Sequence, residues 1–168
     1  MTKLSPTGYR ASQIALHWLV AFVVLFLFVT GDTTTHVFFA GLRAQPSDTS
    51  WAWIPIHIGA GLFVLGAMLW RLGLRRQFGA PSPPTSEPAP LRWLASAVHV
   101  GLYLDLVGAA IVGLLAYFWF PSLAGLHELL SRAVLIVLAL LHIAGALWHE
   151  FYWGDNVLTR MLKPVRDG

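Results

Sequence analysis

Residues 125–152 read GLHELLSRAVLIVLALLHIAGALWHEFY, and this stretch decides the fold. Beyond Arg132 it continues to Trp148 in apolar residues interrupted by a single histidine, His142. A bilayer core of about 30 Å requires roughly 20 predominantly apolar residues in a helix. The stretch therefore predicts a membrane-spanning helix, which Gly154-Asp155-Asn156 ends.

The rest of the chain has a similar composition. The 168 residues are 57% hydrophobic and only 11% charged, with a mean hydropathy of +0.65, whereas soluble domains contain about 25% charged residues. So few charges cannot cover a water-facing surface. Three further apolar stretches, at about 12–30, 53–74 and 91–118, complete a predicted all-α, up-down bundle of four transmembrane helices. We expect residues 1–168 to form this one domain.

Proline and basic residues predict the connections and the orientation. Residues 80–90 are rich in proline, which removes amide donors and fixes φ, so a non-helical, extended loop is expected there. Cytoplasmic loops carry an excess of Lys and Arg. If the helices alternate, most basic residues lie on one side: Lys3, Arg10, Arg71, Arg75, Arg76, Arg92, Arg160, Lys163 and Arg166. The other side has Arg43 and Arg132. Both termini are therefore expected to be cytoplasmic.

The absence of cysteine restricts the chemistry. It excludes disulfides, thiolate-bound iron–sulfur clusters, cysteine zinc sites and covalently attached c-type haem. Any metal chemistry must use histidine or carboxylate, and the chain has seven histidines against eight acids. The net charge of +3 does not predict nucleic-acid binding, because the basic residues lie at helix ends, where membrane topology places them.

The histidines within the predicted helices fall at two depths, at about 1.5 Å per residue. His57 and His127 lie near the outer ends of their helices. Four others lie toward the cytoplasmic side: His17, His99, His142 and His149. A six-coordinate haem iron takes one imidazole on each side, and two facing helices can supply such a pair. Depth therefore favours an outer pair, His57 and His127, and leaves the inner ligands open among the other four.

The rotation of the histidines about their helix and the glycines near them give two further tests of a haem site. His142 is about 22 Å deeper than His127 and about 60° round the helix, on the same broad face. Glycines flank the histidines: Gly59, Gly61, Gly66, Gly108, Gly113 and Gly145. A flat macrocycle between helices needs missing side chains, although glycine also lets transmembrane helices pack closely without a cofactor. His36 follows three threonines and is predicted to lie in a solvated loop.

Motifs at these histidines resemble those of the bacterial di-haem cytochrome b561 family, which is related to the cytochrome b subunits of nickel–iron hydrogenases. The resemblance covers nearly the whole chain. Its anchors are residues 15–19 (ALHWL), 57–71, 99–103 (HVGLY), 126–128 (LHE), 141–142 (LH) and 154–160 (GDNVLTR). The chain looks most similar to the short superoxide oxidase type, which takes an electron from superoxide outside the membrane and reduces ubiquinone.

The resemblance implies two non-covalent b-type haems in a multi-pass protein of the bacterial inner membrane. By the family pattern, His57 and His127 would ligate the outer haem iron, and His17 and His142 the inner one. Superoxide would be the electron donor and ubiquinone the acceptor. The interval from His127 to His142 is one residue longer than is usual in the family. Glu150 stands where some relatives have a second histidine.

Further residues are candidates for the same activity. His149 and His99, with Glu150, lie where titratable groups could deliver protons to a quinone, and both histidines also remain alternative inner ligands. His149 with Glu150 would otherwise form only an interfacial polar cap. Arg71 could neutralise a haem propionate or serve as a cytoplasmic anchor. On the outer side, the two arginines could attract an anionic donor.

Two alternatives keep the membrane bundle and change the function. The chain could be the haem-bearing membrane anchor of a larger oxidoreductase complex, with electrons supplied by a partner subunit, although its short outer loops offer little docking surface. It could also be a histidine-lined metal transporter without haem. Transporters carry intramembrane acids or broken helices along a path, and here Asp105 is the only acid clearly inside a predicted helix.

Overall fold

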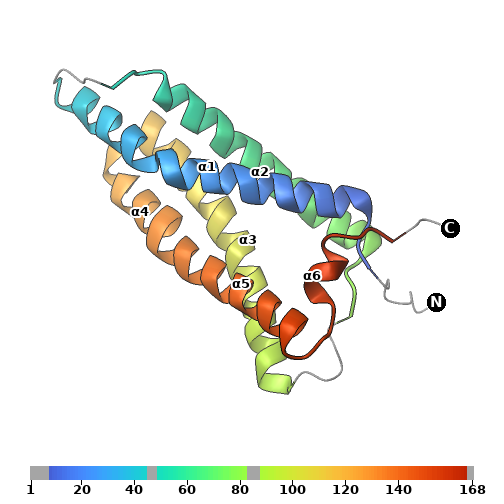
Figure 1. Cartoon of the computed structure of the whole chain (residues 1–168). Coiled ribbons are helices and arrows are strands. Elements are labelled where there is room, and N and C mark those ends of the chain that lie inside the picture. Colours follow the sequence, from blue (N-terminus) through green and yellow to red (C-terminus); the bar gives the residue numbers. More distant parts are fainter. Residues whose placement is uncertain (1–7, 45–48, 83–87, 166–168) are drawn as a thin grey trace.

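The computed structural model describes residues 8–44, 49–82 and 88–165, and every regular element among them is helical. In chain order the elements are α1 (Ala11–Leu42), α2 (Trp53–Phe78), α3 (Ala89–Phe118), the 3₁₀ turn η1 (Pro121–Leu123), α4 (Ala124–Leu129), the π-helical turn η2 (Leu130–Val134), α5 (Leu135–Phe151) and the short α6 (Val157–Arg160). Figure 1 shows α1 beside α2, with α3 crossing between α2 and the α4–α5 rod. This is the predicted up-down bundle.

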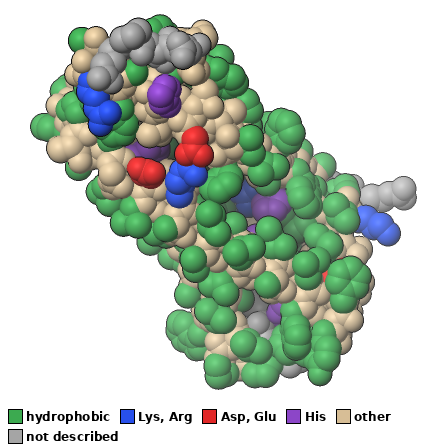
Figure 2. All heavy atoms as spheres, turned by 60° about the vertical axis from the view of Figure 1, so that its left-hand side comes forward, with side chains coloured by type: hydrophobic (Ala, Val, Ile, Leu, Met, Phe, Trp, Pro, Cys, Tyr) green, Lys and Arg blue, Asp and Glu red, His purple; other side chains and the backbone are tan. Residues whose placement is uncertain are grey.

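Four segments are long and apolar enough to cross a membrane: Ala11–Leu42, Trp53–Phe78, Ala89–Phe118 and Pro121–Phe151. Their large apolar side chains point outward, and Phe22, Leu104 and Phe151 are 70%, 69% and 80% exposed. Figure 2 shows hydrophobic side chains spread along the whole length of the visible surface. Contact of so much apolar area with water would be unfavourable at about 25 cal/mol per Å², whereas lipid removes this penalty. The chain is a multi-pass membrane protein.

The two ends of the described chain meet at one end of the bundle. The backbone N–H of Val165 donates to the carbonyl of Tyr9 at 3.0 Å, and the indole Nε1 of Trp18 donates to the carbonyl of Met161 at 2.8 Å. The segment that carries α6 is thereby held against the start of α1. Both ends of the described chain therefore lie on the same side of the membrane-spanning bundle (Figure 1).

The first helix is longer than predicted, because it continues to Leu42 rather than ending near Thr30. The Thr30 hydroxyl donates to the carbonyl of Phe26 at 2.8 Å, and the Thr34 hydroxyl donates to the carbonyl of Thr30 at 3.2 Å. Threonine hydroxyls bonded to the preceding turn can stay within a helix. The prediction of a loop at His36 is therefore wrong. This residue is exposed, as expected, but lies in α1.

The proline-rich connection is shorter than predicted. Helix α2 continues through Phe78, and α3 already begins at Ala89, with Pro90 in its first turn. Proline is tolerated there because a first-turn amide has no acceptor within the helix. Residues 83–87 lie outside the described part of the chain. Lys3 and Arg166, used above for orientation, also lie outside it, as do the ends of the predicted 1–168 domain.

The last membrane span is not the uninterrupted helix that the sequence predicted over 125–152. The π turn η2 divides it into α4 and α5. The hydroxyl of Ser131, within η2, donates to the carbonyl of His127 in the preceding α4 at 2.7 Å. A π turn contains about one residue more than an α turn. The turn can thus accommodate the additional residue between His127 and His142, and it changes their relative rotation by about 100° from that of a regular helix.

Candidate functional site

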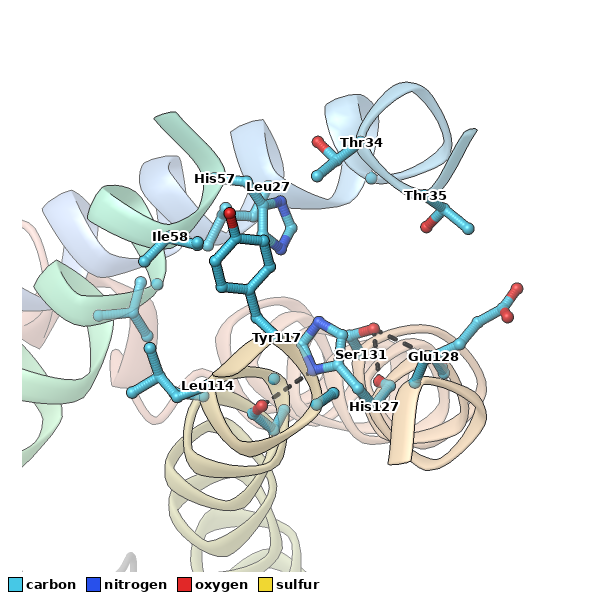
Figure 3. Close-up of a pocket in the computed structure, with 18 of the residues that line it drawn as sticks. Leu27, Thr34, Thr35, His57, Ile58, Leu114, Tyr117, His127, Glu128 and Ser131 are labelled. Atoms are coloured by element: carbon cyan, nitrogen blue, oxygen red, sulfur yellow. Dashed lines mark hydrogen bonds between the residues drawn. The ribbon is translucent and has the colours of Figure 1, made fainter. Parts of the chain in front are cut away.

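The structure brings His57 of α2 and His127 of α4 together. Their ring centroids are 6.0 Å apart and the ring planes are 85° to each other. Figure 3 shows the two imidazoles approaching from different helices across a shared pocket. The depths calculated from the helical rise per residue predicted that these two histidines lie close together. The role of the two residues as iron ligands is an additional step, which is taken below as a proposal.

The backbone of α3 positions the His127 ring. Its Nδ1 lies 2.9 Å from the carbonyl oxygen of Ala109, and since a carbonyl only accepts, Nδ1 is the donor. The neutral ring then has its free lone pair on Nε2, where it can bind a metal. A Cβ on Gly113 would come within 2.8 Å of His127 Cε1 and 2.9 Å of Nδ1. Only glycine leaves space for the ring in this position.

A large pocket surrounds this pair. Its empty space is about 1320 Å³, a volume that includes open solvent at its mouth. Leu27, Ile58 and Leu114 are among its apolar lining residues. Nδ1 of His57 is buried in the pocket without a hydrogen-bond partner among the described residues. An apolar slot between two imidazoles suits a flat apolar macrocycle.

A second histidine cluster joins three helices. The His142 ring on α5 lies 6.0 Å from the His17 ring on α1, at an interplanar angle of 65°. It lies 5.0 Å from the His99 ring on α3, at 88°. Nδ1 of His99 donates to the carbonyl of Ala95 at 2.6 Å. In the described part of the chain, no three histidine or acidic side chains converge to hold a single metal ion.

Arg71 lies near the second cluster, close enough to interact electrostatically with His17 and His142. Its Nε and one terminal nitrogen are buried without a hydrogen-bond partner among the described residues. A buried guanidinium without an anion is unfavourable, so this position suits an anionic group. Tyr9 lies at the same end, where burial raises the pKa of its phenol despite the opposing charges of Arg75 and Arg71.

His149 contacts residues of the turn that leads into α6. Its Nδ1 is 3.0 Å from Asp155 Oδ2, and its ring packs edge-on against Trp153 at 4.7 Å. The neighbouring Glu150 accepts hydrogen bonds from the backbone N–H groups of residues 158 and 159 and from the hydroxyl of Thr159. The structure thus gives Glu150 a helix-capping role at the start of α6.

Sequence reasoning missed the ion pair between Arg132 of η2 and Asp32 of α1. The guanidinium also lies 5.7 Å from the centre of the Phe28 ring. The two charges are separated by a hundred residues in sequence, and no local pattern relates them. The carboxylate of Asp32 neutralises Arg132, which weakens its expected attraction for an anionic donor and leaves Arg43 as the other outer arginine.

Comparison with known proteins identifies the family to which the chain belongs. A family model described as prokaryotic cytochrome b561 matches residues 8–164. The chain is 32% identical to cytochrome b562 of Cereibacter sphaeroides, across 94% of this chain and 96% of that protein. It is 26% identical to the probable superoxide oxidase CybB of Yersinia pestis (94% and 97% covered) and 25% identical to cytochrome b561 homolog 1 of Escherichia coli K12 (92% and 96% covered). With its four membrane spans and paired histidines, the chain belongs to the prokaryotic cytochrome b561 family of membrane electron-transfer proteins, and this membership implies binding of b-type haem.

Proposed function

We propose that this protein holds two b-type haems and transfers electrons from superoxide, on the periplasmic side of a bacterial inner membrane, to ubiquinone. His57 and His127 would be the axial ligands of one haem, and His17 and His142 those of the other. The observation that carries the proposal is the presence of two imidazole pairs, each with ring centroids 6.0 Å apart, at two levels of one membrane bundle.

The ring separations support this choice of ligands. Metal–imidazole bonds of about 2 Å on each side give two coordinating rings a centre-to-centre distance close to 6 Å. The His17–His142 pair meets this distance, whereas the 5.0 Å between His99 and His142 is short for it. The hydrogen bond from His127 to Ala109 keeps Nε2 available for iron. Arg71, two of whose guanidinium nitrogens have no hydrogen-bond partner among the described residues, would neutralise a propionate at the second level.

Bound haem would supply a one-electron iron couple at each histidine level. The protein's own residues hold each macrocycle between helices and exclude water with apolar side chains. At the C-terminal end, Asp155 orients His149, whose Nε2 can hold or release a proton. We place the quinone near His149. This placement puts the quinone site and both termini on the cytoplasmic side, the orientation that the clustering of basic residues favours. The donor is supported by the relative named as a probable superoxide oxidase.

Purified protein with a full haem complement tests the proposal in two stages. A pyridine haemochrome assay should find two b-type haems per chain, and a colourless protein or a single haem would refute the two-haem arrangement. Superoxide loss should then accelerate together with reduction of a short-chain ubiquinone. A protein with two haems that does neither would refute superoxide as the donor. A subunit that copurifies and reduces the haems would instead favour the membrane-anchor alternative.

A further inference from the structure

Asp105 is a buried carboxyl group in the middle of α3. Only 5% of the residue is exposed, and neither carboxylate oxygen has a hydrogen-bond partner among the described residues. Asp105 lines the same pocket as His57 and His127. An intramembrane acid is costly and marks a functional site by default, and the electron-transfer role proposed above assigns nothing to this one.

The packing of α3 shows which segment Asp105 faces. Gly101, Asp105, Ala109 and Gly113 recur every four residues and so share one helix face. At one end of this face, Gly101 packs against Leu138 of α5. A Cβ added to Gly101 would lie 3.0 Å from the Leu138 side chain. At the other end, Ala109 and Gly113 meet His127 of α4. Asp105 lies between them and therefore faces the last span between residues 127 and 138, which includes the π turn η2.

Charged and titratable groups of the pocket do not neutralise Asp105. They are His57 on α2, Tyr117 on α3, His127 and Glu128 on α4, and Arg132 on η2, while the pocket-lining residues of α1 and α5 add no titratable side chain. Arg132 is paired with Asp32, and both imidazoles must be neutral to bind iron. An isolated carboxylate in apolar surroundings is strongly unfavourable, so the group becomes neutral unless positive charge is near.

We propose that Asp105 is an internal proton-binding site whose occupancy follows the electron at the His57–His127 level. When a one-electron donor delivers one electron there, Asp105 takes up one proton from water through the pocket, and the carboxylate becomes a carboxylic acid. When the electron leaves, the proton is released. This inference rests on the proposed haem at His57 and His127.

Electrostatics gives the sign of the coupling. The oxidised ferric site has one more positive charge than the reduced ferrous site, and nearby positive charge favours the carboxylate. Reduction removes that charge and favours the acid. The reduction potential at this level should therefore fall as pH rises, over the pH window in which uptake of the electron brings a proton onto Asp105. Outside this window the potential should be independent of pH.

Redox titration of the haem-loaded protein at several pH values tests the coupling. One of the two haem potentials should fall with pH, by up to about 59 mV per pH unit, since that shift corresponds to a tenfold change for a one-electron couple. In Asp105→Asn, which keeps the side-chain shape, this slope should vanish while the haem count stays at two. The matched control is Glu128→Gln, which removes the other pocket carboxyl group and should leave the slope in place.

Infrared difference spectroscopy gives a readout independent of the potentials. The reduced-minus-oxidised spectrum of the unaltered protein should contain a protonated carboxyl band that shifts in D₂O, disappears in Asp105→Asn and persists in Glu128→Gln. Absence of the band overturns the inference even if Asp105→Asn cannot be purified. A pH-dependent slope or a band that survives in Asp105→Asn also overturns it. Loss of haem from the unaltered protein would instead refute the proposed function, and the haemochrome count reveals this separately.

Discussion

Replacing Gly113 with alanine should selectively disrupt the His57–His127 level. The new Cβ would lie 2.8 Å from His127 Cε1, and the ring would have to move by roughly 0.6 Å to reach the 3.4 Å of an ordinary contact. Its Nδ1 hydrogen bond to Ala109, now 2.9 Å long, would be strained or broken. Loss of such a bond costs about 0.5–1.5 kcal/mol, and overpacking a well-filled site costs about 1–3 kcal/mol.

We therefore expect Gly113→Ala to bind haem at this level about 10–100-fold more weakly, the range seen when groups that orient a metal ligand are altered. Such a loss corresponds to about 1.4–2.7 kcal/mol. Haem titration of detergent-solubilised apoprotein, followed by visible absorption, would show one weakened site and one site of unchanged affinity.

Gly66→Ala is the matched control for Gly113→Ala, because its Cβ would meet nothing within 4 Å. It should bind both haems as the unaltered protein does. Two tight sites in Gly113→Ala would refute the reasoning that the α3 backbone sets the position of His127. Equal weakening of both levels would show that the substitution acts on the whole bundle.

Four further substitutions, in three experiments, separate the contributions of individual residues. His57→Ala and His17→Ala should each lose one of the two haems, and each variant should lose it from a different level. The reduced-minus-oxidised spectra of the two variants should sum to that of the unaltered protein. Loss of both haems from either variant would contradict independent sites. Arg71→Gln should weaken haem binding at the His17–His142 level by about tenfold, the equivalent of about 1.4 kcal/mol, since the haem propionate loses its cationic partner; an unchanged affinity in the same titration would assign Arg71 to membrane anchoring alone. Trp18→Phe removes the hydrogen bond to Met161, worth about 0.5–1.5 kcal/mol, and should speed amide exchange in residues 153–165 by up to about tenfold without changing haem content; exchange as slow as before would show that other contacts hold the segment.

The sequence predicted the features that depend on local quantities. Apolar length identified the four spans, and the rise per residue placed His57 and His127 at one depth. The same depth argument could not choose among the inner histidines, because it gives neither the facing of a ring nor the distance between rings. It also grouped His149 with His142, whereas the turn after α5 brings His149 to Asp155. The ligand roles of these residues remain predictions.

The features that sequence reasoning missed depend on hydrogen bonds between side chains and backbone and on long-range contacts. Hydroxyl groups of Thr30 and Thr34 donate to the preceding turn where α1 continues beyond its predicted end, and that of Ser131 lies at the π turn. Hydropathy scores such residues only as polar, so it ended one helix early and treated another as continuous. The Asp32–Arg132 pair has no local signal at all, since it depends on how α1 and η2 lie in the finished bundle.

The bond between Trp18 and Met161 joins positions 143 residues apart. At a synthesis rate of about 5–20 residues per second, Met161 is made roughly 7–30 s after Trp18. During this interval α1 and its neighbours must remain together in the membrane without the C-terminal tie. Closure of this end of the bundle through that bond thus cannot precede the synthesis of Met161, and any cofactor entering beside α1 before that moment meets an end of the protein that is still open.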